Sequence, residues 1–578
     1  MTNEVWIIEA PGKKRYLEET LKLLGRDAFV VFTKGHLYRF PLREKGKKSS
    51  PIIDKNFNDF GREPLDSNIL HRIREVVKLC PNVMVATDAD QEGDVIAWDV
   101  ACLIRDIAPN PSRIPLKGMD SDSVLEALSA KGPVKRSAAV PGRTRRIIDI
   151  LIGSAYSNTG IRVGRIGTAL LGMVASEQPT TNFMRLSAPS SDGRSPWIAQ
   201  CPIKSPITES IAKEIVGLSL PVLDPVETLD RTFKPQHMGE IMIEAAETLG
   251  LSPSETAKAM QASYEAGKLS YPRSSSKGIS RAAAVKMKSI LAKAGKRANP
   301  DLLDTKTEKD VHDSPHPLGA VNLSLDPTKM SAEEGVRLLI ARGIARAGMK
   351  HKYQRAKGEI VEKFLLSKGI PIKAAKYVGS LEWTRDLGST IPGKKRWQKS
   401  EVYKRRSDAV LLETALKHNL GKPSTWGTHV EAFLKLGLVN SDLALTERGK
   451  EWLSRSPVEL LDPEFSARIE EACDYVDQDI FKVRGKTPWQ ASAERIVKSL
   501  PPAITDRIIG AISGIPAKPE PDYREMVDNL PSTLTPEEME LLAERTGPDA
   551  IMATSNVQPF LPEFPYDEGT IPDYEISH

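Results

Sequence analysis

The sequence predicts a multidomain fold in which an N-terminal α/β domain with a parallel sheet precedes a mainly helical remainder that contains some strands. Three observations support this prediction. The chain has 578 residues, which is enough for roughly three to five domains. Up to residue 107, short apolar runs alternate with amphipathic segments, a pattern typical of a parallel sheet covered on both faces. After residue 140, most periodic segments have helical spacing.

In the N-terminal region, strands and helices are expected in alternation. The apolar runs predict strands over residues 5–9, 29–32 and 82–87. The segment PGKKRYLEETLKLLG is expected to begin as a loop and continue as a helix, because Leu17, Leu21 and Leu24 share one helical face. Residues 67–80 and 93–107 are predicted to form two further helices.

The remainder of the chain is predicted to be largely helical. Helices are expected over residues 143–152, 208–216, 237–249, 252–266, 280–294 and 332–347, and again between 408 and 500. Ser252, Pro253 and Glu255 form a typical helix start. Residues 359–383 are instead expected to be strand-like. Residues 491–578 are expected to form an acidic extension with one helix over 536–547.

Composition excludes several classes of protein. No run of about 18 apolar residues occurs, so we expect no membrane span and no membrane partner. The N-terminus lacks the basic start of a signal peptide. The four cysteines, Cys80, Cys102, Cys201 and Cys473, form no CxxC pair, which argues against a zinc ribbon or a disulfide framework. A cytoplasmic location follows, in the nucleoid or, for a viral protein, in the host cytoplasm.

The net charge of +5 conceals an asymmetry between the C-terminal segment and the rest of the chain. Residues 515–578 contain three Lys/Arg and fourteen Asp/Glu, a net charge of −11, so residues 1–514 carry +16. A basic body favours a polyanionic partner. The acidic segment is expected to be a solvated extension, with competition for the same basic surface as the alternative.

Four carboxylates fall within the run MVATDADQEGD, directly after the third predicted strand. Ligands of parallel sheets bind beyond the carboxyl ends of strands, and alternate residues of an extended stretch point the same way. Asp88 and Asp90 are therefore expected to converge with Glu92. Glu9 reaches the same sheet edge if the first and third strands are neighbours. Hard carboxylate oxygens suit Mg²⁺, whereas the alternative is a solvated acidic loop.

Two of these segments, WIIEAPGK and MVATDADQEGD, resemble the Toprim domain of topoisomerases, primases and a class of nucleases, which act on phosphodiesters with Mg²⁺. The segment YEAGKLSYPRSSSKGIS is similar to the catalytic motif of the type IA topoisomerases. This resemblance implies that Tyr271 is the nucleophile and Arg273 its phosphate partner. It also implies that Lys13 contacts the scissile phosphate. His312, in HDSPHP, is identified as a further catalytic residue.

Further segments resemble the same family in the same order. They are TKGHLYRFP (33–41), RTRRIIDILIGSAYS (143–157), IRVGRIGTALLGMV (161–174), GKPSTWGTHVEAFLKLGLV (421–439) and FSARIEEACDYV (465–476). The resemblance covers residues 4–490. It implies that DNA is contacted by Arg145, Arg146, Asp149, Arg162, Arg165, Thr168, Lys422, Ser424 and Thr425.

The family resemblance also implies an architecture: a Toprim domain joined to an arch of helical and β-containing domains, forming a ring with a central hole. The Toprim domain would span residues 1–140, and domain IV residues 141–205 and 400–490. Domain II would span 206–232 and 319–399, domain III 233–318 with Tyr271, and an acidic extension 491–578.

The implied activity is ATP-independent relaxation of negatively supercoiled DNA through a 5′-phosphotyrosine on one strand. Glu9 is the implied general acid/base. Asp88, Asp90, Glu92 and Glu9 are the implied ligands of Mg²⁺, which Mn²⁺ could replace; neither ATP nor zinc is expected. The expected partners of a monomer are single-stranded and negatively supercoiled DNA, and RNA is left open.

Three positions depart from the family pattern. Ser275 lacks the usual carboxylate, Gly167 stands for a glutamine and Lys422 for an arginine, which suggests a divergent, minimal member of viral or mobile-element origin. Two alternatives stay open. A Toprim nuclease or primase would use the acids but not Tyr271. A catalytically decayed DNA-binding ring would bind DNA without forming a covalent adduct.

Overall fold

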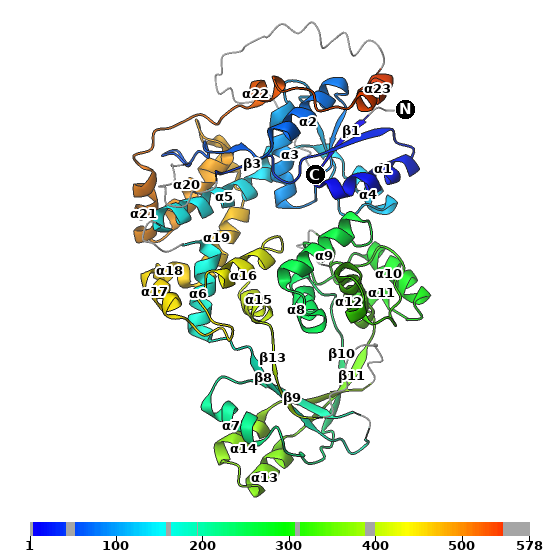
Figure 1. Ribbon diagram of the computed structural model, residues 1–578, viewed down its shortest axis with the longest axis vertical. Helices are drawn as coiled ribbons and strands as arrows, with labels where there is room; N and C mark the ends of the chain where they lie inside the picture. The colour runs from blue at the N-terminus through cyan, green and yellow to red at the C-terminus, as the bar shows by residue number, and fades with distance from the viewer. Residues whose placement is uncertain are drawn as a thin grey trace. The chain divides into compact units, whose positions relative to one another are not determined.

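The computed structural model describes residues 4–41, 52–157, 163–193, 195–306, 312–387 and 399–546. The chain divides into two compact units (Figure 1). Unit 1 consists of Met1–Leu116, Leu125–Ala155 and Glu471–His578, and unit 2 of Lys117–Val124 and Tyr156–Glu470. Three helices cross a unit boundary along the chain: α4 (Ser121–Ser129), α5 (Arg136–Tyr156) and α19 (Pro463–Asp474). Across the described ranges, no helix combines the length and apolarity needed to cross a bilayer.

Unit 1 is built on a five-stranded sheet in the order β2-β1-β5-β6-β7. Its strands are β1 (Glu4–Ile8), β2 (Ala28–Phe32), β5 (Val83–Val85), β6 (Ser112–Arg113) and β7 (Gly132–Pro133). β1 pairs in parallel with both β2 and β5. The first and third predicted strands are therefore neighbours, which was the condition for Glu9 to reach the same sheet edge as Asp88. Every residue of β1 is buried, as expected for a parallel strand covered on both faces.

Helices and a two-stranded antiparallel sheet complete unit 1. They are α1 (Lys14–Leu23), α2 (Ser67–Leu79), α3 (Gln91–Ile104), α20 (Pro488–Ser499), α21 (Pro502–Ile512), α22 (Arg524–Asp528) and α23 (Pro536–Thr546), with β3 (Tyr38–Arg39) paired to β4 (Glu63–Pro64). Three apolar side chains of the C-terminal segment, Val527, Leu534 and Leu542, are buried in the same core as the sheet. The expectation of a solvated extension is therefore wrong for this segment, because its apolar residues complete a core.

Unit 2 contains a six-stranded antiparallel sheet in the order β10-β11-β12-β9-β8-β13. Its strands are β8 (Asn182–Ala188), β9 (Trp197–Pro202), β10 (Glu227–Arg231), β11 (His351–Ala356), β12 (Trp383–Asp386) and β13 (Glu401–Lys404). β8, β9 and β13 come from segments predicted as domain IV, and β10–β12 from domain II. The predicted boundaries at 205/206 and 399/400 therefore cut through one sheet.

The prediction of a strand-like stretch over residues 359–383 is wrong for most of its length. This stretch forms α13 (Glu359–Ser367) and α14 (Ile372–Ser380), and only β12 begins within it. The reason is visible in the spacing of Val361 and Leu365, which lie four residues apart and are both buried in the core beside α7 (Pro206–Glu214). Helical packing on the sheet decides the conformation here.

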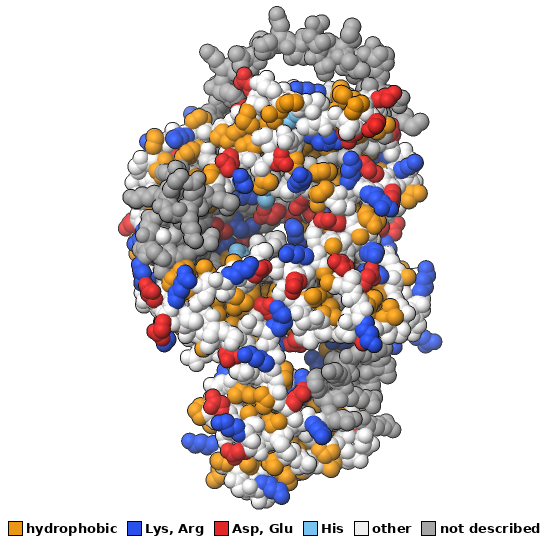
Figure 2. All heavy atoms as spheres, viewed as in Figure 1, with side chains coloured by type: hydrophobic (Ala, Val, Ile, Leu, Met, Phe, Trp, Pro, Cys, Tyr) orange, Lys and Arg blue, Asp and Glu red, His pale blue; other side chains and the backbone are white. Residues whose placement is uncertain are grey.

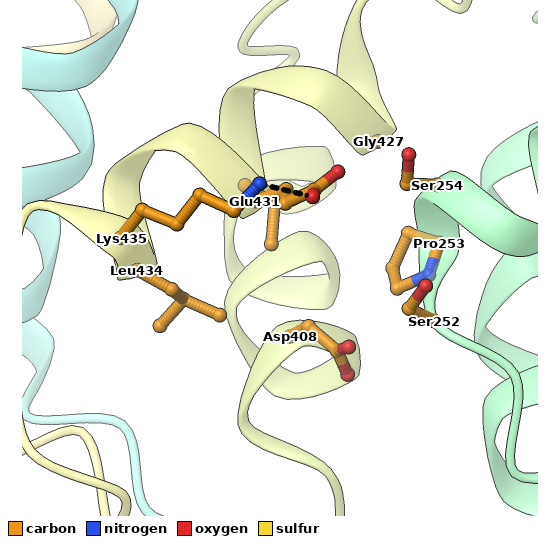
Figure 3. A pocket seen from close by; sticks show the side chains of 9 residues that line it. Ser252, Pro253, Ser254, Asp408, Gly427, Glu431, Leu434 and Lys435 are labelled. Carbon is orange, nitrogen blue, oxygen red and sulfur yellow. Dashed lines mark hydrogen bonds and ion pairs between the residues drawn. The ribbon is translucent and has the colours of Figure 1, made fainter.

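Unit 2 contains further helices besides α9 (Pro253–Glu265). They are α6 (Arg165–Glu177), α8 (Met238–Leu249), α10 (Arg281–Lys293), α11 (Pro300–Leu303), α12 (Ala332–Ala347), α15 (Ser407–Lys417), α16 (Trp426–Lys435), α17 (Glu447–Arg455) and α18 (Val458–Leu461). Of these, α8, α12, α15 and α16 pack against α9. The predicted start of α9 is confirmed, because Ser252 Oγ accepts from the Glu255 backbone N–H at 3.1 Å. A cavity of about 300 Å³ lies where this start faces Asp408 and α16 (Figure 3).

Charges of both signs are dispersed on the surface that Figure 2 shows. Lysine and arginine side chains alternate with aspartate and glutamate side chains there rather than gathering into one patch. Net charge by itself therefore does not locate a binding site on this face.

Candidate active site

Two neighbouring strands deliver the predicted acids to one sheet edge. Glu9 directly follows β1, and Asp88 follows β5 and forms a parallel bridge with Leu116. Lys13, at the end of the short 3₁₀ turn Pro11–Lys13, forms an ion pair with Asp88. The two side chains are 1% and 0% exposed. A lysine that would be expected on the surface by itself is therefore the buried counter-charge of the first predicted metal ligand.

Each remaining acid of the MVATDADQEGD run has its own polar contact. Asp90 accepts from the Gly93 backbone N–H at 2.7 Å and caps α3. Glu92 Oε2 lies 2.6 Å from His36 Nε2 and 3.7 Å from Arg146. Burial opposes the ionisation of Glu92, but the His36 hydrogen bond and the charge of Arg146 outweigh it and lower the pKa of Glu92 to about 2. Glu92 is therefore ionised at neutral pH.

The expected convergence of Asp88, Asp90 and Glu92 is not present. Within the described ranges, no three His, Cys, Asp or Glu side chains lie close enough together to hold a metal ion. The physical reason is that Lys13 holds Asp88 while His36 and Arg146 hold Glu92. The donor chemistry still fits Mg²⁺, since hard carboxylate oxygens follow the ends of adjacent strands. Metal ligation by these residues stays a prediction.

Gly93 permits the tight turn between β5 and α3. A Cβ atom on Gly93 would lie 2.1 Å from the Asp88 carbonyl oxygen, which is backbone and cannot rotate away. We expect Gly93→Ala to displace Asp88 and to destabilise the protein by about 1–3 kcal/mol, as overpacking does. Urea unfolding measures this loss. Gly132→Ala is the control, because a Cβ there meets nothing within 4 Å. Equal stabilities of the two variants would contradict the prediction.

Tyr271 lies on the loop that follows α9 and is 2% exposed. Its ring packs against His312, with centroids 4.6 Å apart, and edge-on against Tyr264 at 5.6 Å. Its backbone N–H donates to the Lys117 carbonyl at 3.0 Å. The structure therefore brings together Tyr271 and His312, which the sequence separates by about 40 residues. Because Tyr271 is buried, access to its hydroxyl requires movement of the side chains around it.

The loop after Tyr271 is held by hydrogen bonds on both sides. The Ser270 N–H donates to the His316 carbonyl at 2.9 Å, and the Met238 N–H donates to the Ser274 carbonyl at 3.0 Å. Burial lowers the pKa of His316, which keeps its ring neutral. Arg273 is half-buried, whereas Ser275 is exposed. The missing carboxylate at Ser275 therefore belongs to an exposed position and leaves no gap in the core.

The predicted DNA-contacting residues fall into two groups. On α5, Arg145 donates to Gln91 and to Asp474, at 2.7 Å each, and Arg146 lies against His36; Asp149 follows on the same helix. In unit 2, Arg165 and Lys422 lie 2.7 and 3.8 Å from the same carboxylate, Glu470.

The remaining predicted contacts lie close to this second group. Thr168 accepts from the Gly164 N–H at 3.3 Å, and Thr425 donates to the Lys422 carbonyl at 3.2 Å. Ser424 is half-buried. Arg162 lies outside the described residues.

Sequence reasoning missed the polar residues that contact the predicted ones. His36, Glu470 and Asp474 were not named, although each lies in a segment that resembles the family. The signal available for all three was that each is a polar residue within a segment that resembles the family. Their contacts with Glu92, Arg165 and Arg145 join residues distant in sequence, so only the folded chain identifies the pairs.

Gly167, which replaces the family glutamine, leaves room for a side chain. A Cβ atom at this position of α6 would meet nothing within 4 Å. We expect Gly167→Gln, in the first turn of α6, to stabilise the protein by roughly 0.4–1 kcal/mol, because replacing glycine at a compatible backbone position lowers the conformational entropy of the unfolded chain. Thermal unfolding tests this expectation. Gly172→Gln is the opposite control, since its Cβ would lie 2.0 Å from the Leu461 carbonyl oxygen and should destabilise.

Comparisons with known proteins agree on one family. A family model described as DNA topoisomerase matches residues 135–484, and the Toprim domain model matches residues 4–117. DNA topoisomerase 1 of Aquifex aeolicus (strain VF5) is 23% identical over 540 residues, covering 84% of this chain and 96% of that protein. DNA topoisomerase 1 of Campylobacter jejuni is 22% identical over 560 residues, covering 85% and 77%. Full-length topoisomerase I from Thermotoga maritima aligns with a TM-score of 0.57 at 16% identity, covering 87% of this chain and 90% of that one.

Proposed function

Because this chain belongs to the type IA DNA topoisomerases, we propose that Tyr271 is the nucleophile with which it cuts and rejoins one DNA strand. The observation that carries the proposal is the buried contact between Tyr271 and His312 on the loop after α9. We further propose that the enzyme acts as a cytoplasmic monomer on single-stranded regions of negatively supercoiled DNA.

The proposed reaction consists of two opposite displacements. The Tyr271 hydroxyl gives up its proton to solvent as its oxygen attacks the phosphorus, a 5′-phosphotyrosine bond forms, and the bond to the 3′-oxygen breaks. Glu9 gives a proton to the leaving 3′-oxygen. Arg273 and Lys13 stabilise the charge that develops on the phosphate, and His312 orients the Tyr271 ring. The 3′-hydroxyl then reverses the step, so the phosphotyrosine conserves the bond energy and no ATP is consumed.

Toprim domains and type IA topoisomerases generally use Mg²⁺ and need no ATP. In this chain, Asp88, Asp90, Glu92 and Glu9 would hold the ion, which supplies a counter-charge for the phosphates of the cut strand. Removal of Mg²⁺ with EDTA should therefore abolish relaxation of supercoiled DNA, while single-strand cleavage persists. Added Mg²⁺ or Mn²⁺ should restore relaxation on an agarose gel. Full relaxation in EDTA would contradict this role of the acids.

The proposed function is tested with single-stranded DNA labelled at its 5′ or its 3′ end. After denaturation, a covalent complex that retains the 3′-label establishes a 5′-phosphotyrosine. Cleavage without an adduct would favour the nuclease alternative. Binding with neither product would favour a decayed DNA-binding protein.

A further inference from the structure

The C-terminal residues 515–542, here called the strap, lie across the N-terminal part of unit 1. At its start, the Lys55 N–H donates to the Ile515 carbonyl at 3.3 Å, and the Lys518 N–H donates to Asp54 at 2.8 Å. Further on, the Tyr523 hydroxyl donates to the Arg62 carbonyl at 2.7 Å. The strap is thus bound through its backbone as well as its side chains, and its path is defined.

The second half of the strap is anchored on α2. Asp528 lies 2.6 Å from Arg74 and 2.8 Å from Lys78. Val527 and Leu542 are buried in the core of unit 1. The strap therefore has an attachment that is independent of its first half, and a change in the first half does not release the whole segment.

The first half of the strap contributes one carboxylate, that of Glu520, to an otherwise buried ionic network, and the Glu520 side chain itself is 39% exposed. Glu520 Oε1 lies 2.9 Å from Arg143 and 3.1 Å from Arg62, and these two guanidinium groups are each 3% exposed. Arg143 also contacts Asp59 at 2.8 Å, and Arg62 contacts Asp99. Two buried guanidinium groups near one another repel, so each carboxylate that lies between them fixes their positions.

Arg143 lies one turn before Arg146 on α5. Arg146 is the residue that lies 3.0 Å from His36 and 3.7 Å from Glu92. Because an α-helix is rigid over one turn, fixing the Arg143 side chain also fixes the rotation and height of the helix segment that carries Arg146. Glu520 is therefore linked to Arg146 through Arg143 and one turn of α5.

We propose that Glu520 of the C-terminal strap is a positioning residue that aligns Arg146 of α5 for contact with the phosphates of single-stranded DNA. This inference rests on the proposed role of Arg146 in DNA binding. The chemistry that Glu520 serves is recognition of a phosphodiester by a guanidinium, whose planar fork loses its second hydrogen bond when it is turned or shifted.

The test compares Glu520→Gln with Glu525→Gln in the full-length protein. Both variants remove one carboxylate from an exposed residue of the strap, and of the two only Glu520 contacts Arg62 and Arg143. Affinity for a labelled oligonucleotide is measured together with the thermal unfolding temperature. We expect Glu520→Gln to weaken binding about tenfold, as expected for loss of one charge-assisted hydrogen bond to a phosphate, and Glu525→Gln to bind normally. Glu520→Asp, which keeps the charge, should recover part of the affinity.

A double-mutant cycle with Arg146→Ala separates positioning from general stability. If Glu520 acts through Arg146, Glu520→Gln has little further effect once Arg146 is alanine. Additive losses, or a Glu520→Gln variant that binds like Glu525→Gln, would overturn the inference. If Arg146→Ala itself bound DNA with normal affinity, the proposed role of Arg146 in DNA binding would be refuted. That result is distinguishable from a failure of the inference about Glu520. Asp528→Asn, at the other anchor, should lower the unfolding temperature without changing affinity.

Discussion

Replacement of Tyr271 with phenylalanine should abolish both the covalent complex and relaxation, with a loss of at least about 10³-fold, as expected for removal of a nucleophile. The variant lacks only the hydroxyl oxygen, so the ring should keep its packing against His312 and Tyr264. Affinity for single-stranded DNA should stay close to that of the wild type. The measurement is the fraction of 3′-labelled oligonucleotide that migrates with the protein on a denaturing gel.

Tyr264→Phe is the matched control for this experiment. Tyr264 is buried next to Tyr271, and its substitution removes the same atom from the same ring cluster. We expect this variant to form the adduct at a rate within about tenfold of the wild type, because one buried hydrogen bond is worth roughly 1 kcal/mol. An adduct that persists in Tyr271→Phe and disappears in Tyr264→Phe would assign the nucleophile to the other tyrosine.

Replacement of Lys13 with methionine should destabilise the protein by about 3–5 kcal/mol, because it leaves a buried carboxylate without its counter-charge. Asp88 is 0% exposed beside Lys13, so water does not replace the lost ammonium group. The measurement is urea unfolding in EDTA, which prevents a metal ion from taking the place of the lysine. The same variant should lose strand cleavage, because Lys13 is proposed to contact the scissile phosphate.

Two further variants separate the stability effect from the catalytic one. Lys13→Met combined with Asp88→Asn removes both charges and should recover most of the lost stability, but no activity. Lys14→Met is the control, because Lys14 is partly exposed and makes only a surface contact of 3.8 Å with Glu18. Its effect should stay below about 1 kcal/mol. Equal stabilities of the Lys13 and Lys14 variants would contradict the importance of the buried pair.

Much of the fold could be predicted where local pattern and packing agree. The apolar run of β1 and the capped start of α9 were predicted because a buried strand and a helix start each have a local signature. The prediction for residues 359–383 was wrong because the spacing of apolar residues in a short segment is compatible with either a helix or a strand. Burial of Val361 and Leu365 beside the sheet decided in favour of helices.

In the candidate site, too, residues within local motifs could be predicted, whereas contacts between distant residues could not. Tyr271, Asp88 and Glu92 were named from motifs, and their chemistry follows from residue type. The contact of Lys13 with Asp88 and that of His36 with Glu92 each join residues that are more than 50 positions apart. No local sequence pattern predicts which cation lies beside which acid. The strength of an ion pair depends on how well the surrounding segments exclude water from it, and those segments are distant in sequence.

By itself, the sequence determined the family, the order of its motifs and the kinds of side chain available for the chemistry. Only the tertiary structure decided that Lys13 is buried against Asp88 and that the acidic C-terminal segment completes the core of unit 1 through Val527 and Leu542. The physical reason is that local propensity and periodicity act over a few residues. Desolvation and charge pairing depend on which distant segments exclude water from one another.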